Sequence, residues 1–166
     1  MFNKEQFIHS VRMEANICKH LYEKIPADSL SWRPTPSQRS VLELLQYLAA
    51  CCVVPTQNIL KNDWSQVRDT LAQYQSLPAE DFPDMMDKQV REVEKLLQPY
   101  SDQELLDMKT STPMGTESAV GSCLVNLPLK FLAAYRMQLF FYLKLLGVEN
   151  LSTSNLWAGM DRPQQS

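Results

Sequence analysis

The sequence contains very little glycine and histidine, and both shortages restrict what the chain can be. Only 4 of its 166 residues are glycine, and no run of β-branched or aromatic residues alternates cleanly with polar ones. Extended strands and Gly-rich phosphate loops therefore have little support. The 2 histidines, His9 and His20, fall on one predicted helix, roughly 16 Å apart along its axis. That separation is too great for both imidazoles to bind one metal ion.

The chain also lacks an excess of charge of either sign. Its 16 basic and 19 acidic residues are interspersed and give a formal net charge of −3, which provides no electrostatic surface for nucleic acid or for an anionic membrane. The first sixteen residues mix charges with apolar residues, unlike a signal peptide. We therefore expect a cytoplasmic protein that binds neither nucleic acid nor membranes.

An uncharged apolar run of membrane-spanning length is missing as well. Residues 127–146 have the required length of about 20 residues, but Arg136 and Gln138 would lie near the bilayer centre, where an arginine costs roughly 3 kcal/mol. The segment is better explained as a buried helix of a bundle. Its apolar residues nevertheless cover nearly every side, which predicts a homodimer packed partly through this fourth long helix. The alternative is that the C-terminal tail covers the spare face with Leu156 and Trp157.

The 4 cysteines show no spacing typical of a zinc site or a redox motif. Cys51 and Cys52 are adjacent in sequence, and neighbours rarely form a disulfide without strain. We expect the cysteines to act as small apolar side chains in the core. A reactive thiol remains the alternative.

Helical periodicity accounts for most of the chain. It predicts an all-α four-helix bundle with additional short connecting helices. A single domain is expected over 1–160, and a disordered tail over 161–166. Long helices are expected over residues 3–25, 41–61, 83–98 and from 116 or 118 to 146, with short ones within 62–80 and at 101–104.

Five local signals set the expected helix boundaries and bends. Ser40 with Glu43, and Ser101 with Glu104, each have the spacing of a capping box. Prolines predict a bend at residue 55 and a kink at residue 128. Gly147 is the expected left-handed cap of the fourth long helix. Residues 109–115 are expected to be extended and exposed.

Two stretches resemble the DinB-like family, also called DinB/YfiT-like metalloenzymes. They are "LSWRPTPSQRSVLELLQYLA" at 30–49 and "AAYRMQLFFYLKLLG" at 133–147. The resemblance covers nearly the whole chain and implies a helical bundle. It also implies a divalent metal, such as zinc or nickel, held by one histidine of the second long helix and two of the fourth. At those positions this chain has Tyr47, Phe131 and Tyr135.

None of these three residues is a histidine, and phenylalanine has no donor atom for a metal. The family's metal site is therefore expected to be lost, and no cofactor is expected. Two interpretations of Tyr47, Phe131 and Tyr135 stay open: an aromatic cluster that fills the vacated cavity, or a remodelled pocket whose phenols bind a small molecule. Arg136 is expected to form a structural ion pair, with Gln138 in the same network and Glu14 on a solvated flank.

The sequence therefore predicts a dimeric small-molecule binding or interaction protein of DinB-like fold. The alternative is a thiol-dependent transferase or hydrolase, as the resemblance to metal-bearing family members suggests. Such an enzyme would have to use Tyr47, Tyr135 or the adjacent Cys51 and Cys52 without a metal to lower the pKa of a thiol.

Overall fold

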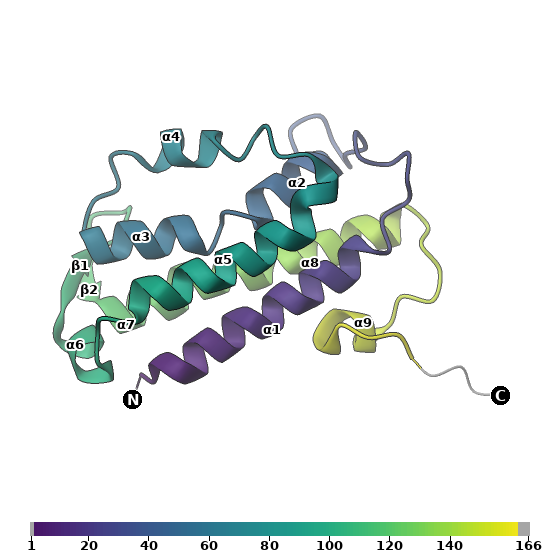
Figure 1. Cartoon of the computed structure of the whole chain (residues 1–166). Helices are drawn as coiled ribbons and strands as arrows, with labels where there is room; N and C mark the ends of the chain where they lie inside the picture. The colour runs from purple at the N-terminus through teal and green to yellow at the C-terminus, as the bar shows by residue number, and fades with distance from the viewer. Residues whose placement is uncertain (1, 163–166) are drawn as a thin grey trace.

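The computed structural model describes residues 2–162, and four long helical stretches packed side by side form its frame (Figure 1). Helix α1 packs against both α5 and α8, while α2 lies on α8 and α3 lies on α5. The predicted all-α bundle with short connecting helices is confirmed. The long stretches are α1 (Lys4–Tyr22), α2 (Val41–Leu48) with α3 (Val53–Lys61), α5 (Phe82–Leu97), and α7 (Val120–Leu124) continuing into α8 (Lys130–Leu145).

The second long stretch is interrupted at residues 49–52, upstream of the bend expected at Pro55. Pro55 lies in the first turn of α3, where no N–H is needed; in a continuous helix its ring would collide with the carbonyl of residue 51. The side chain of Gln89 on α5 forms hydrogen bonds with the backbone groups that the interruption leaves without helical partners. Its Oε1 accepts hydrogen bonds from the N–H groups of Cys52 (2.9 Å) and Val53 (3.1 Å), and its Nε2 donates to the carbonyl of Leu48 (3.0 Å).

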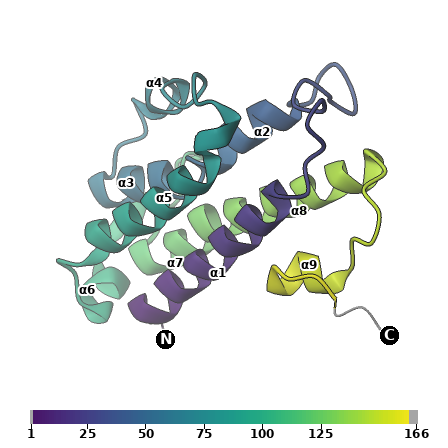
Figure 2. The same cartoon turned by 45° about the vertical axis from the view of Figure 1, so that its right-hand side comes forward.

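Residues 62–78 form an arm that leaves the bundle between α3 and α5. The arm carries the short helix α4 (Val67–Ala72), which has no buried residue, and leads into the 3-10 turn η1 (Ala79–Asp81). Both views show α4 set apart from the long helices (Figures 1 and 2). Trp64 anchors one end by donating to the carbonyl of Ser111 (2.7 Å). Gln46 anchors the other by donating to the carbonyls of Gln75 and Leu77.

A small hairpin follows α6 (Asp102–Asp107), and the sequence prediction missed it. Strands β1 (Lys109–Ser111) and β2 (Glu117–Ala119) pair antiparallel, with Lys109 opposite Ala119. Of the segment 109–115 that was expected to be extended and exposed, residues 109–111 form a strand with Thr110 buried. The expectation that the fourth long helix starts at 116 or 118 is wrong, because α7 begins at Val120. Strands of three residues are too short for a period of two to be recognised.

The fourth long helix contains one wide turn at the expected kink. Between α7 and α8, residues Val125–Leu129 are π-helical and include Pro128 (η2). A π turn is a common way to accommodate a residue that cannot donate to the regular ladder. Gly147 follows the helix with φ of +77°, which confirms the predicted left-handed cap.

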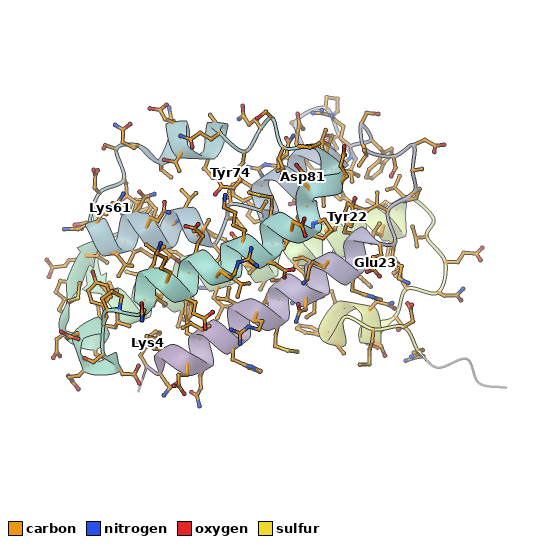
Figure 3. The ribbon with its side chains drawn as sticks, viewed as in Figure 1. Lys4, Tyr22, Glu23, Lys61, Tyr74 and Asp81 are labelled. Atoms are coloured by element: carbon orange, nitrogen blue, oxygen red, sulfur yellow. The ribbon has the colours of Figure 1, made fainter. Side chains whose placement is uncertain are left out.

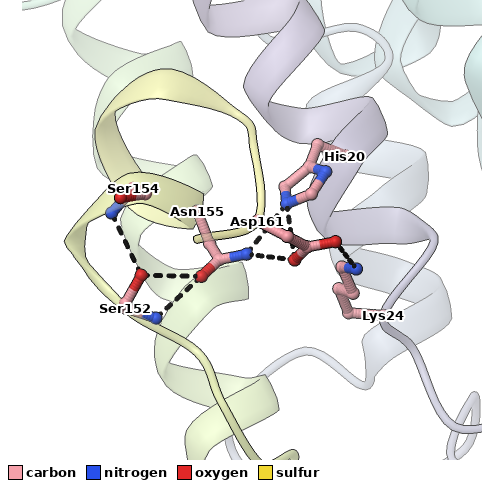
Figure 4. Close-up of polar contacts among 6 residues, drawn as sticks. All are labelled: His20, Lys24, Ser152, Ser154, Asn155 and Asp161. Carbon is pink, nitrogen blue, oxygen red and sulfur yellow. Dashed lines mark hydrogen bonds and ion pairs between the residues drawn. The ribbon is translucent and has the colours of Figure 1, made fainter. Parts of the chain in front are cut away.

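The tail folds back as α9 (Thr153–Ala158) and packs on α1. Leu156 is buried, but Trp157, which the alternative interpretation placed over the spare face of the fourth long helix, is 60% exposed and covers little of it. The fully buried Asn155 anchors the tail instead (Figure 4). Its Nδ2 lies 3.0 Å from His20 Nε2 and donates to Asp161 (2.8 Å). Of the predicted disordered tail, residues 163–166 lie outside the described residues.

Within residues 2–162, no helix has both the length and the apolar character needed to cross a membrane.

Candidate functional site

The fold brings together two of the three positions that the resemblance singles out. Tyr47 on α2 and Tyr135 on α8 are in edge contact, with ring centroids 4.5 Å apart and planes at 64°. Phe131 lies one helical turn before Tyr135 and packs, half-buried, against the core. Among the described residues, no ring pairing joins Phe131 to either tyrosine. The aromatic cluster is therefore a pair, with Phe131 beside it.

Arg39 completes this pair, and the sequence analysis did not identify it. Its guanidinium carbon lies 4.1 Å from the ring centroid of Tyr47 and 5.3 Å from that of Tyr135, within the range of a cation–π contact. The backbone here is fixed from α8, because the Tyr142 hydroxyl donates to the Arg39 carbonyl (3.0 Å) and accepts from Gln138 (2.7 Å). Gln138 thus holds the loop before α2, and its expected place in the Arg136 network is wrong.

Tyr47 is held as a neutral phenol. Burial raises the pKa of Tyr47 above its ordinary value of 10, and the neighbouring Cys51 and Tyr135 raise it further, while Arg39 opposes the shift. A phenol that keeps its proton is a poor metal ligand but a good hydrogen-bond donor. The chemistry available at this position is therefore binding through the hydroxyl group.

Tyr47 and Arg39 line a groove of about 1110 Å³ that opens between α2, the loop before it and the arm. Tyr135 and Phe131 do not line it, so Tyr47 is the one of the three predicted pocket residues that borders this groove. Tyr74 of the arm points toward α5 (Figure 3), and burial raises the pKa of its phenol, helped by Glu92. The lining residues are Leu30, Ser31, Arg33, Pro36, Ser37, Gln38, Arg39, Ser40, Leu42, Glu43, Gln46, Tyr47, Arg68, Leu71, Tyr74 and Gln75.

The N-terminus of α2 lines the groove with the two residues of its capping box, Ser40 and Glu43. The Ser40 N–H donates to the Glu43 carboxylate (2.7 Å), and the Glu43 N–H donates to the Ser40 hydroxyl (3.2 Å), which confirms the predicted capping box. This bond to the Ser40 N–H, with the nearby Arg33, lowers the pKa of Glu43. Arg33 lies 3.3 Å from the same carboxylate. Glu43 is therefore ionised and already has its partners.

The cysteines are unsuited to nucleophilic chemistry. All four are buried. Burial raises the pKa values of the Cys18 and Cys51 thiols well above normal and that of Cys52 to about 12. Since the thiolate is the reactive form, these side chains are core residues of the kind the sequence predicted.

The metal that the family pattern implies does not fit the residues present. Phe131 has no donor atom and Tyr47 keeps its proton, so neither can replace a histidine. His9 is exposed on α1, and His20 is engaged with Asn155 of the tail. In the part of the chain that the structure describes, no three His, Cys, Asp or Glu side chains lie together as a metal would require. No chemical step is therefore assigned to a metal.

Arg136 forms a structural ion pair, as the sequence predicted. Its partner is Glu14, which the sequence analysis did not identify as the partner. Its guanidinium binds Glu14 through two hydrogen bonds (2.6 and 3.2 Å) and donates to the carbonyl of Leu156 (2.8 Å). The Glu14 side chain is only 18% exposed, so its expected position on a solvated flank is wrong. This cluster joins α1, α8 and the tail on the side of α1, and it belongs to the scaffold.

Comparison with solved structures places the fold among the DinB-like proteins. A DinB-like protein from Bacillus subtilis is 18% identical, with 89% of this chain and 95% of that chain covered at a TM-score of 0.66. A protein from Exiguobacterium sibiricum assigned to the DinB family is 22% identical, with 90% and 95% covered at a TM-score of 0.68. No family model and no curated protein matches the sequence. At these identities the likeness establishes the fold, and at that level the resemblance is confirmed.

Proposed function

We propose that this chain of DinB-like fold binds a small organic molecule in the groove beside Tyr47, without the help of a metal ion. The observation that carries the proposal is the groove itself, which is bounded by Tyr47 and the neighbouring Arg39 on one side and by the arm on the other. Its volume of about 1110 Å³ is slightly larger than the roughly 300–1,000 Å³ of typical ligand sites, so it has room for a ligand of metabolite size.

The walls offer the mixture of surfaces that small-molecule sites use. Leu42 and Leu71 supply apolar area from the bundle and from the arm, and the neutral Tyr47 hydroxyl supplies a donor. A thiol-dependent transferase or hydrolase fits the groove less well, because none of the buried cysteines lines it and none of its lining residues is a histidine that could serve as the base of a nucleophile.

A fragment screen followed by protein-observed NMR tests the proposal, since a chain of 19.1 kDa gives resolved amide spectra. We expect the amides that shift on fragment binding to cluster at residues 30–47 and 68–75. Fragments that bind elsewhere only, or a library that yields no binder, would contradict a ligand site in the groove.

We also propose that the outward face of α8 forms a homodimer. Phe141 and Leu145 lie one turn apart and are 56% and 65% exposed, and Ala134 and Met137 continue the stripe. A second copy is the occupant that fits, because a two-fold axis at the middle of this stripe pairs its apolar residues with their own copies.

Light scattering after size exclusion tests the dimer. We expect a dimer for the natural sequence, a monomer for Phe141→Glu, and a dimer for the control Met114→Glu. Met114 is 86% exposed at the tip of the hairpin, away from α8. A natural chain that is monomeric at micromolar concentrations, or a Phe141→Glu variant that stays dimeric, would contradict the proposal.

A further inference from the structure

We infer that the ligand of the groove carries an oxyanion, such as a carboxylate or phosphate, which is held between Arg39 of the bundle and Arg68 of the arm. This inference rests on the proposed binding function and assigns the chemical class of the ligand. The starting observation is charge. Three arginines line the groove with one carboxylate, and that carboxylate, Glu43, is paired with Arg33.

The other two arginines, Arg39 and Arg68, have no carboxylate that neutralises their charge. Throughout residues 2–162, no carboxylate lies within 4.0 Å of Arg39 or Arg68. Guanidinium groups stay protonated at every physiological pH. The groove therefore has an excess of two positive charges, although the chain as a whole has a net charge of −3.

The surroundings of Arg39 distinguish it from an ordinary solvated arginine. Its side chain is half-buried, and its guanidinium carbon lies over the Tyr47 ring, 4.1 Å from the centroid. Among the described residues its side-chain N–H groups have no hydrogen-bond acceptor, yet none of these nitrogens is sealed from solvent. A half-buried guanidinium with free N–H groups beside a groove is well suited to bind an oxyanion through two parallel hydrogen bonds.

Arg68 provides the second contact because the arm is held over the groove at both ends. Trp64 and Gln46 fix those ends, while α4 between them buries no residue. An anion that contacts both arginines therefore links a loosely packed segment to the bundle. The remainder of the ligand would lie on Leu42 and Leu71, so an amphipathic anion fits best.

Two fluorescent probes that differ by one charged group test the inference. The probes are 1-anilinonaphthalene-8-sulfonate and its neutral counterpart N-phenyl-1-naphthylamine, titrated against the full chain. Four variants are compared with the natural sequence: Arg39→Gln, Arg68→Gln, Leu71→Ser and the control Arg91→Gln. Arg91 is exposed on α5 and does not line the groove, so its replacement removes the same charge elsewhere. Arg68 is exposed on the arm, so its variant remains informative if Arg39→Gln disturbs folding.

We expect the sulfonate probe to bind more tightly than the neutral probe. Its affinity should fall about tenfold in Arg39→Gln and in Arg68→Gln, because each variant loses one charge-assisted contact. Affinity for the neutral probe should not change in these variants, and Arg91→Gln should affect neither probe.

The two proposals fail in different ways. If both probes bind with equal affinity, if that affinity falls in Leu71→Ser, and if it is unchanged in both arginine variants, then the groove binds ligands but the anion inference is wrong. If neither probe binds, or if the affinity is the same in Leu71→Ser and in the arginine variants as in the natural sequence, both the anion inference and the proposed function are contradicted.

Discussion

Replacing Gln89 tests whether one side chain holds the interruption between α2 and α3. Gln89 is 2% exposed and makes three hydrogen bonds to backbone groups that a continuous helix would otherwise satisfy. A Gln89→Leu variant keeps much of the volume but leaves two N–H groups buried without partners and leaves the Leu48 carbonyl with only the weak thiol donor of Cys51. Each net hydrogen bond contributes about 1 kcal/mol, and each orphaned buried group costs about 1–3 kcal/mol. Partial relaxation and water entry reduce the sum, so we expect a loss of about 3–4 kcal/mol in the free energy of unfolding.

Urea unfolding followed by circular dichroism at 222 nm measures this loss. Lys88→Leu is the matched control, because Lys88 is exposed on the same helix, and its replacement should change the unfolding free energy by less than about 0.5 kcal/mol. If Gln89→Leu were as stable as this control, the interruption would not depend on Gln89. The steric effect of Pro55 alone would then be enough to set the angle at which α2 presents Tyr47.

Three further predictions concern the buried pair, the thiols and the tail. Replacing Arg136 with Met leaves the Glu14 carboxylate buried without its partner, so the free energy of unfolding in urea should fall by about 3–5 kcal/mol, whereas an unchanged value would refute a structural role. The four buried thiols should react with a thiol reagent such as Ellman's only after unfolding, and a fast-reacting thiol in the native protein would contradict their assignment as core residues. The hydrogen bond from Lys24, with Asn155 and His20, lowers the pKa of Asp161 below 3.8, so its contribution to tail docking is present above that pH and is lost as the pH falls through the lowered pKa. Amide signals of α9 in an NMR pH titration should move in that acidic range, and an Asp161→Asn variant should lack the transition.

Features that depend on residues close in sequence were predictable. The capping boxes at Ser40 and Ser101 and the cap at Gly147 are each encoded within four residues, and the structure has all three. The apolar period of α5 predicted its ends to within one residue of the observed Phe82–Leu97. These signals survive because local geometry alone determines them.

Features that depend on distant partners were not predictable. Glu14 looked solvated because the residue that buries it, Arg136, is 122 positions away. The interruption at residues 49–52 is completed by Gln89 on another helix. The groove requires the arm to lie over α2, and neither Arg39 nor Arg68 belongs to a sequence motif that indicates this. The contact between Tyr47 and Tyr135 was anticipated only because the family pattern placed both positions at one site.

The replacement of the family's ligand residues changes the kind of cation that the site can use. A histidine set would hold a divalent metal, which polarises bonds and activates water or thiols. Here, two phenols hold the guanidinium of Arg39, a single delocalised charge that forms hydrogen bonds in a fixed plane. Such a group can recognise and orient an anion but cannot act as a Lewis acid, and the nearby thiols keep their protons. The chemistry on this face of the bundle therefore supports the proposed anion binding, and the comparison of a sulfonate probe with its neutral counterpart tests that proposal directly.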